Sequence, residues 1–288
     1  MSRIGIIGGS GLYNIDGLEG VKEVAVDTPF GKPSDKFVCG KLEKRDVVFL
    51  PRHGKGHRIL PSEINYRANI YGMKKLGVDR IISIGAVGSF KKELKPQDIL
   101  VVSQFVDRTN QARRMTFFGD GIAAHIPFAQ PVCGDLAKTL YESGKTVGAT
   151  MHNGGTYLNM EGPAFSTLAE SLLYKSWGMD VIGMTNMAEA RLAREAEICY
   201  STLAMITDYD CWCMDEEDAP TVTIDLIIEN LNKNAETAKK LIKHALKALP
   251  KEPSCACKDT LKEAIITPKD LMPKTRKRDL EIIIGKYL

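Results

Sequence analysis

The chain has 288 residues, of which 44% are hydrophobic and 26% charged, a composition typical of a soluble globular protein. Its 39 basic residues exceed its 36 acidic ones by three, and the segment from Lys251 to the C-terminus, with nine basic and six acidic residues, holds this whole excess. The rest of the chain is balanced, which argues against a nucleic-acid-binding protein. No apolar run approaches the ~18 residues that span a bilayer, and the N-terminus does not resemble a signal peptide. We therefore expect a cytoplasmic protein without membrane association.

Seven cysteines are present, four of them in the Cys-x-Cys pairs Cys211–Cys213 and Cys255–Cys257. An odd number of cysteines in a reducing compartment indicates buried or idle thiols. Zinc sites more typically separate their ligands by two to four residues, so the sequence predicts no metal site. Disulfides would be expected only in a hyperthermophile, where intracellular bridges occur.

Apolar runs and turn residues predict three strands and a helix in the first part of the chain. The strands are Ile4–Ile7, Val47–Leu50 and Ile81–Ile84, each followed by glycine or proline. A helix is expected to begin at Pro61 and to end just before Gly77.

The second part of the chain continues this alternation of strands and helices. Further strands are expected at Asp98–Val102, Val181–Met184 and Ile198–Ile206, and helices after the capping box at Thr167, at Ala188–Ala196 and from Ile224 onward. The alternation predicts an α/β fold whose central sheet is largely parallel and flanked by helices. We expect a single domain over residues 1–288, with a C-terminal helical segment from about residue 222. Ligands in such folds bind beyond the carboxyl ends of the strands.

The glycine cluster Gly8–Gly11 follows the first strand and contains Ser10. Its spacing differs from the dinucleotide fingerprint G-x-G-x-x-G, and the residues that follow, Tyr13–Gly17, are poor helix formers. One interpretation is a tight turn. The other is a cradle for one phosphate, formed by backbone N–H groups and the Ser10 hydroxyl.

Two more strand ends carry residues suited to an anion. Arg52 and His53 follow the second strand, and the guanidinium offers a planar fork of donors that stays charged at any cellular pH. The small residues Gly85–Ser89 follow the third strand and would let a ligand approach the backbone closely. Each motif alone also fits an ordinary turn or strand cap. A parallel sheet would bring all of them to one place.

Asp208 and Asp210 follow the last strand, and residues two apart on an extended chain point the same way. Two close carboxylates do not ionise independently, so one of them is able to keep its proton near neutral pH. Such a pair suits an amino group and a ring nitrogen. A solvated loop is the alternative, because the acidic run Asp215–Asp218 lies just downstream. Phe165, before a helix, fits either a stacking role on a flat base or a plug in the core.

A series of stretches from the first strand to about residue 212 carries a family resemblance. They are GIIGGSGL at 5–12, DTPFGKPSD at 27–35, Arg52–Gly54, Pro61-Ser62 with Asn65-Tyr66, Glu161–Pro163, Gly183–Thr185, Glu195-Ala196 with Ile198–Tyr200, and TDYDCW at 207–212. In this order and spacing they resemble the 5′-methylthioadenosine phosphorylase branch of the trimeric purine nucleoside phosphorylase family.

The resemblance implies an enzyme that cleaves the N-glycosidic bond of 5′-methylthioadenosine with inorganic phosphate as co-substrate and without a cofactor or metal. It implies a homotrimer, or a dimer of trimers, in which each active site is shared between subunits. The site residues that it implies are Ser10, Arg52, His53, Gly85, Ala86 and Thr185 for phosphate, Met184 for ribose, Phe165 and Ser166 for the base, Asp208 and Asp210 for the adenine N7 and 6-amino edge, and His125 for the 5′ end of the nucleoside in a neighbouring subunit's site.

The chemistry of the pair at residues 208 and 210 fits this reaction. Glycosidic cleavage passes through a cationic sugar, which bound phosphate stabilises, and the base leaves more easily when Asp208 gives N7 a proton. Carboxylates accept hydrogen bonds from a 6-amino group, whereas a 6-oxo base would place acceptor against acceptor. An apolar 5′ pocket is expected, with Val222 or Leu226 as candidate lining residues.

This sequence differs from the usual family pattern at several positions, so more than one nucleoside substrate is expected. Gly85 stands where threonine is common, Ala164 where arginine is common, and Asn186–Ala188 where a Thr- or Val-rich segment is usual. Adenosine is therefore a second expected substrate. The alternatives are a purine nucleoside or methylthioinosine phosphorylase acting on 6-oxopurines and, from another class, a nucleotide sensor or a nicotinamide-dependent oxidoreductase.

Overall fold

The computed structural model describes the chain apart from residues 1, 10, 11, 13, 14, 111 and 215–223, and it describes only the backbone of residues 224–227. The strands are β1 Arg3–Gly8, β2 Glu19–Val24, β3 Phe37–Leu42, β4 Arg45–Pro51, β5 Val78–Ser89, β6 Ile99–Val101, β7 Gln104–Arg108, β8 Met151–Asn153, β9 Thr156–Met160, β10 Val181–Gly183 and β11 Cys199–Tyr209. The α-helices are α1 Tyr66–Lys75, α2 Gly134–Thr146, α3 Leu168–Ser176, α4 Asn186–Glu195, α5 Ile224–Ala248, α6 Lys274–Asp279 and α7 Glu281–Ile284. Short 3-10 helices cover Cys211–Cys213, Ala256–Asp259 and Gly285–Tyr287.

The described strands form one mixed sheet in which the central pairings are parallel. Along the main path the order is β2-β3-β4-β1-β5-β10-β9-β7, and β11 pairs with β5 and β6. The strands β4, β1, β5 and β11 run parallel to one another, whereas β2–β3–β4 is an antiparallel meander and β10 lies antiparallel to β5. The predicted α/β class, with a mixed and largely parallel sheet flanked by helices, is confirmed.

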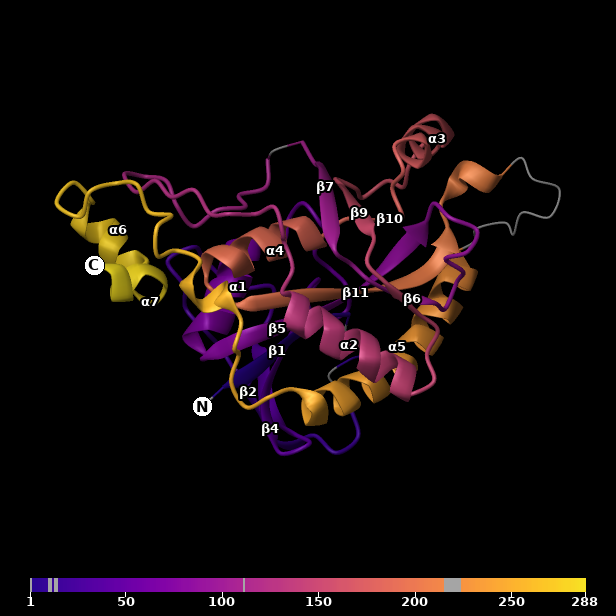
Figure 1. Cartoon of the computed structure of the whole chain (residues 1–288), viewed down its shortest axis with the longest axis horizontal. Helices are drawn as coiled ribbons and strands as arrows, with labels where there is room; N and C mark the ends of the chain where they lie inside the picture. The colour runs from indigo at the N-terminus through magenta and orange to yellow at the C-terminus, as the bar shows by residue number, and fades with distance from the viewer. Residues whose placement is uncertain (1, 10–11, 13–14, 111, 215–223) are drawn as a thin grey trace.

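Alternating side chains of the central strands supply two separate hydrophobic cores, one on each face of the sheet. On β1, Ile4 and Ile6 pack into the core that lies under α2 and α5, while Ile7 packs into the core under α1, α4 and α7. This period of two is what a sheet buried on both faces requires. Figure 1 shows α2 and α5 side by side along one face, with α1 and α4 together elsewhere on the sheet.

Two central strands are longer than the sequence predicts. The segment Gly85–Ser89, expected to be a turn, is the second half of β5, because β11 pairs with it as far as Ser89. Asp208, expected just beyond a strand, lies within β11 after a register irregularity at Thr207. Local turn signals were therefore overridden by pairing with a neighbouring strand.

One helix boundary and one helix face also differ from expectation. The helix expected from Pro61 begins at Tyr66, because Asn65 caps it by accepting a hydrogen bond from the Ala68 N–H. The capping box at Thr167 and Glu170 is present at the start of α3. The leucines of that helix, Leu168, Leu172 and Leu173, are exposed, whereas Tyr174 is buried. Among the described residues, no helix is long and apolar enough to cross a membrane.

Candidate active site

The sheet opens beside the middle of β5, and several of the predicted site residues, among them Arg52, Thr185 and Asp208, lie around this opening. On one side of β5, pairing with β1 ends at Ser83 and pairing with β10 begins only at Gly88. On the other side, β11 pairs with β5 throughout. Gly85 and Ala86 lie between those two limits, at the carboxyl end of β1. A point where neighbouring strands diverge is where α/β sheets bind ligands.

Arg52 lies at the opening as the centre of a buried polar network. Its side chain is 3% exposed, and its Nε donates to Glu189 Oε1 at 2.5 Å. Its Nη2 donates to Ser83 Oγ at 2.6 Å and to Glu189 Oε2 at 3.2 Å, and its Nη1 donates to the Ile84 carbonyl at 2.9 Å. Four of the five guanidinium N–H groups are therefore used within the described residues. The remaining one is on Nη1, the nitrogen that a Cβ added to Gly85 would approach to 3.6 Å.

His53 is held next to Arg52 in its neutral form. Burial and the neighbouring Arg52 charge lower the pKa of His53 to about 4. Its Nδ1 lies 2.8 Å from the Ile59 carbonyl, and its ring stacks on that of His57. A neutral ring that donates from Nδ1 leaves Nε2 as an acceptor. This tautomer offers an acceptor for a hydroxyl, such as that of a protonated phosphate.

The N-terminus of α4 lies at the same opening. Thr185 is the N-cap residue of this helix, is 6% exposed, and makes no side-chain capping bond. The first turn of α4 carries Glu189, which binds Arg52, and Asn186, whose Oδ1 would lie 3.6 Å from a Cβ on Gly85. Asn186 Oδ1 is buried and has no hydrogen-bond partner among the described residues. Unsatisfied N–H groups at a helix N-terminus form a natural place for an anion.

Asp208 and Asp210 meet at Gly88, as their spacing predicts. A Cβ added to Gly88 would lie 3.4 Å from Asp208 Oδ2 and 3.5 Å from Asp210 Cβ. Burial, with a smaller contribution from the Asp210 charge, raises the pKa of Asp208 to about 6, although the Thr207 hydroxyl 2.6 Å from its Oδ1 opposes the shift. Asp208 is thus a buried acid that holds its proton close to neutral pH.

Asp210 is fixed by hydroxyl groups that precede and begin α3. The Ser171 hydroxyl donates to Asp210 Oδ2, and hydrogen bonding from Ser166 further opposes the upward pKa shift that burial causes. The Asp210 N–H donates to the Ser89 carbonyl at 2.9 Å, which fixes its backbone to the end of β5. The alternative prediction, that Asp208 and Asp210 lie in a solvated acidic loop, is wrong. Asp210 is 7% exposed, and Asp208 is largely buried.

Met184 connects β10, which pairs with β5 at Gly88, to Thr185 at the start of α4. It follows β10, and its Sδ is so close to Gly162 that a Cβ there would approach it to 2.5 Å. Arg113 holds this region by donating to the Met184 carbonyl and, through Nε, to Glu161 Oε1 at 3.0 Å. Phe165 is 68% exposed, so the interpretation of this residue as a core plug is wrong.

Four predicted residues, Ser10, Val222, Leu226 and His125, cannot be related to the others within one chain. Ser10 lies outside the described residues, as does Val222, and the side chain of Leu226 is likewise not described. His125 is described and exposed; its N–H donates to the Ala264 carbonyl. No contact between His125 and the other predicted site residues is seen in the described part of the chain.

Glu189, Ser83 and Arg113 are the functional candidates that the sequence analysis missed. A glutamate in the first turn of a helix usually favours the helix dipole at the surface, and nothing local marks Glu189 as the partner of Arg52. Arg113 stands in an irregular segment far along the chain from Glu161. Only the sheet topology brings these partners together.

Comparison with known proteins gives one consistent family. Residues 3–247 match the family model described as the phosphorylase superfamily. An S-methyl-5′-thioadenosine phosphorylase from Geobacter sulfurreducens is 56% identical over 285 residues, which cover 99% of each chain. The crystal structure of a methylthioadenosine phosphorylase from an Antarctic soil metagenomic library has a TM-score of 0.92 at 45% identity, covering 97% of this chain and 98% of that one. An adenosine/methylthioadenosine phosphorylase mutant from Schistosoma mansoni in complex with methylthioadenosine has a TM-score of 0.83 at 33% identity, covering 94% and 100%. The chain therefore belongs to the phosphorylase superfamily and, within it, to the S-methyl-5′-thioadenosine phosphorylases.

Proposed function

We propose that this protein catalyses the phosphorolysis of S-methyl-5′-thioadenosine to adenine and 5-methylthioribose-1-phosphate. Inorganic phosphate is the co-substrate, and no cofactor takes part. The observation that carries the proposal is the arrangement along β5. Gly88 lies next to the carboxyl group of Asp208, and Gly85 lies next to Arg52 and the N-terminus of α4. The two glycines are three residues apart, about 10 Å on a strand, so one ribose fits between an anion at one end and a base at the other.

The phosphate-binding end consists of Arg52, Thr185, His53 and the backbone at Gly85 and Ala86. Arg52 is held charged by Glu189, and the Thr185 side chain makes no capping bond at the start of α4. The Met187 N–H donates to Asn159 Oδ1 at 3.0 Å, so the other N–H groups of this turn are the ones proposed for phosphate. The neutral His53 accepts a hydrogen bond from a protonated phosphate oxygen. Ser10, which lies outside the described residues, remains part of the proposal on sequence grounds. A dianion at this end stabilises the cationic sugar of the transition state and attacks its C1.

The base-binding end consists of Asp208 and Asp210, with Phe165 and Ser166 at its border and Met184 against the ribose. Asp208 gives its proton to N7 as the glycosidic bond breaks, so that adenine leaves as a neutral molecule. Asp210, aligned by Ser171, accepts a hydrogen bond from the 6-amino group. The small residue at Gly88 leaves the space beside both carboxyl groups open.

We propose that the working form is a homotrimer, or a dimer of trimers, in which His125 reaches the 5′ end of a nucleoside bound in a neighbouring subunit. The exposed position of His125 supports a role toward another chain. So do the large apolar side chains that are at least 36% exposed on α3 and its flanks, namely Phe165, Leu168, Leu172, Leu173 and Trp177. The balanced charge gives no reason to expect nucleic acid as a partner. A cytoplasmic location is part of the same proposal and rests on the sequence.

A steady-state assay with three nucleosides tests the function. Release of adenine from methylthioadenosine should require phosphate, and kcat/KM should exceed that for methylthioinosine and inosine by about 10²-fold or more, because a 6-oxo group faces carboxylate acceptors. Adenosine should be cleaved as a second substrate, since the Schistosoma mansoni relative is an adenosine/methylthioadenosine phosphorylase. A preference for the 6-oxo nucleosides would contradict the proposed base recognition, and base release without phosphate would contradict phosphorolysis.

A further inference from the structure

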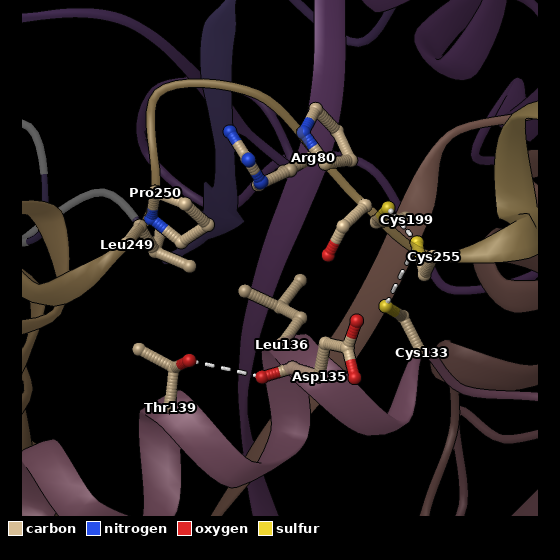
Figure 2. Close-up of a pocket in the computed structure, with 11 residues that line it drawn as sticks. Arg80, Cys133, Asp135, Leu136, Thr139, Cys199, Leu249, Pro250 and Cys255 are labelled. Carbon is tan, nitrogen blue, oxygen red and sulfur yellow. Dashed lines mark hydrogen bonds between the residues drawn. The ribbon is translucent and has the colours of Figure 1, made fainter.

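Four cysteines from three separate segments converge at the edge of the sheet away from the active site. They are Cys133 at the start of α2, Cys199 at the start of β11, and Cys255 and Cys257 in the segment after α5. All four Sγ atoms lie within 4.8 Å of one another. Cys255 Sγ is 3.2 Å from Cys199 Sγ and 3.6 Å from Cys133 Sγ. Figure 2 draws both contacts as dashed lines.

These separations fit four ligands around one metal ion. Zinc binds thiolate sulfur at about 2.3 Å in tetrahedral geometry, which places each pair of sulfurs about 3.8 Å apart. A disulfide would require about 2.05 Å, and all seven cysteines of the chain are free thiols. An iron–sulfur cluster holds its cysteines further apart, because several iron and sulfide atoms lie between them. The spread of the four Sγ atoms leaves room for a single ion.

The surroundings of the cysteines are rigid and mostly closed to water. Cys133, Cys199 and Cys257 are 3%, 3% and 7% exposed, and the Cys133 N–H donates to the Tyr200 carbonyl at 2.8 Å, which ties the start of α2 to β11. Cys133 and Cys255 are the N-cap residues of α2 and of the 3-10 helix at Ala256–Asp259, and neither side chain makes a capping hydrogen bond. Metal binding by these sulfurs would therefore not remove a helix cap. A preformed site of four soft ligands without an open position is typical of structural zinc.

The adjoining cavity also contains a positive charge. A small cavity of about 30 Å³ is lined by Arg80 together with Cys133, Cys199 and Cys255. The Arg80 side chain is nearly buried, and its Nη2 has no hydrogen-bond partner among the described residues. Figure 2 shows its guanidinium near Pro250, on the side of the cavity away from the sulfurs. A zinc ion with four thiolates has a net charge of −2. The guanidinium of Arg80 offsets part of it, although Asp79 lies 3.6 Å from Arg80 Nη1 and Asp135 also lines the cavity.

We propose that Cys133, Cys199, Cys255 and Cys257 bind one structural Zn²⁺ ion. The sequence predicted no metal, because Cys-x-Cys alone has unusual spacing; the fold supplies the other two ligands. Cys199 and Asp208 are nine residues apart on β11, about 30 Å, so the ion takes no part in the reaction. It attaches the segment after α5 to α2 and β11, and binding it requires release of the thiol protons.

Metal analysis of the wild-type protein is the first test. The untagged chain, expressed with zinc and iron both available and purified without chelator, should contain about one zinc per chain by mass spectrometry of the metal. After denaturation with a chelator and without reductant, seven thiols should react with a thiol reagent. No metal with seven thiols, no metal with three thiols and the other four in disulfides, or iron in place of zinc would each overturn the proposal.

Serine variants then assign the ligands. Cys255→Ser and Cys257→Ser should each reduce the zinc content at least tenfold, while Cys39→Ser, a half-buried thiol on β3, keeps one zinc per chain. Where a ligand variant fails to fold, the metal and thiol content of the wild type still decides the question. Co²⁺ in place of zinc should give the intense visible bands of a tetrahedral tetrathiolate, and their absence would also count against the site. Full zinc in both ligand variants would show that the ion lies elsewhere.

Discussion

Burial turns one carboxyl group, Asp208, into the proposed acid of the reaction. Its position in β11 removes it from water, and the pKa near 6 follows mainly from this desolvation. A fraction of this carboxyl group therefore stays protonated at neutral pH, and the charge of the neighbouring Asp210 adds to the shift. Asp210, whose pKa is also raised by burial, is bound by serine hydroxyls and is suited to accepting rather than donating.

This assignment predicts a pH dependence of catalysis. Since only the protonated form of Asp208 donates, kcat/KM should fall as the pH rises above about 6. Asp208→Asn should lower kcat by about 10²–10⁴-fold and abolish this alkaline limb. The measurement is the pH profile of adenine release, with the exposed Asp270→Asn as a control that keeps the wild-type profile. An unchanged limb in Asp208→Asn would assign the titration to another group.

The same variant separates catalysis from stability. The pKa of Asp208 in the folded state exceeds its ordinary value of 3.8, so its contribution to stability is full below about pH 4 and is lost as the pH rises through 6. Asn cannot ionise, so Asp208→Asn should raise the free energy of unfolding by about 1–3 kcal/mol at pH 7.5 while it lowers activity. Loss of both together would mean that Asp208 supports the fold.

At the scale of elements, the ion pair between Arg52, just after β4, and Glu189 in the first turn of α4 connects the two elements. The sequence of neither element alone predicts this pair. Glu189 is 1% exposed and accepts hydrogen bonds from Arg52, from Ser83 and from the Tyr200 hydroxyl. Each of these donors comes from a different element. The pair is retained at the phosphate-binding end, where an isolated buried guanidinium would be costly.

Glu189→Gln should therefore be far more destabilising than its size suggests. It leaves the Arg52 charge buried without a counter-charge and points an amide N–H at groups that themselves donate, so we expect a loss of about 3–5 kcal/mol in the free energy of unfolding. Glu236→Gln, at an exposed glutamate on α5 that pairs with the half-buried Lys239, should change it by less than about 0.5 kcal/mol. Urea unfolding at one fixed protein concentration measures both. Equal midpoints for the two variants would contradict a charge-compensating role.

The strands and helices also show which parts of the fold could be predicted from the sequence. Apolar runs predicted the cores of β1, β4, β5, β10 and β11 and the long helix α5, because burial on both faces of a sheet leaves a local signal. The strand β2 and the helix α2 were not predicted. The end of β5 was wrong because Gly85–Ser89 has turn-like composition and becomes a strand only through pairing with β11. Spacing brought Asp208 and Asp210 together, whereas Glu189 and the four-cysteine cluster depend on contacts distant in sequence.

At the scale of the whole molecule, the sites at the two ends of the sheet have different tasks. The opening beside β5 holds the proposed reacting groups, and the proposed zinc site at the beginning of β11 would attach the C-terminal segment. That segment in turn packs against α1 through Leu280, Ile283 and Ile284, which are all buried in the same core. It also contacts the neighbourhood of His125, because the His125 N–H donates to Ala264. The order of this segment thus affects the surface that another subunit would meet.

Assembly can be tested by mixing two damaged chains. Light scattering should give a mass near three times 31.8 kDa, or six times for a dimer of trimers. His125→Ala should raise KM for methylthioadenosine with the assembly intact, and Asp208→Asn should remove most activity. If His125 serves a neighbour's site, co-expression of the two variants creates sites with an intact Asp208 from one chain and an intact His125 from another, so a share of sites with wild-type KM should return. If both residues served the same chain's site, no mixed assembly would contain a fully intact site. The absence of such recovery in mixed assemblies, or a fully active monomer, would contradict the shared site.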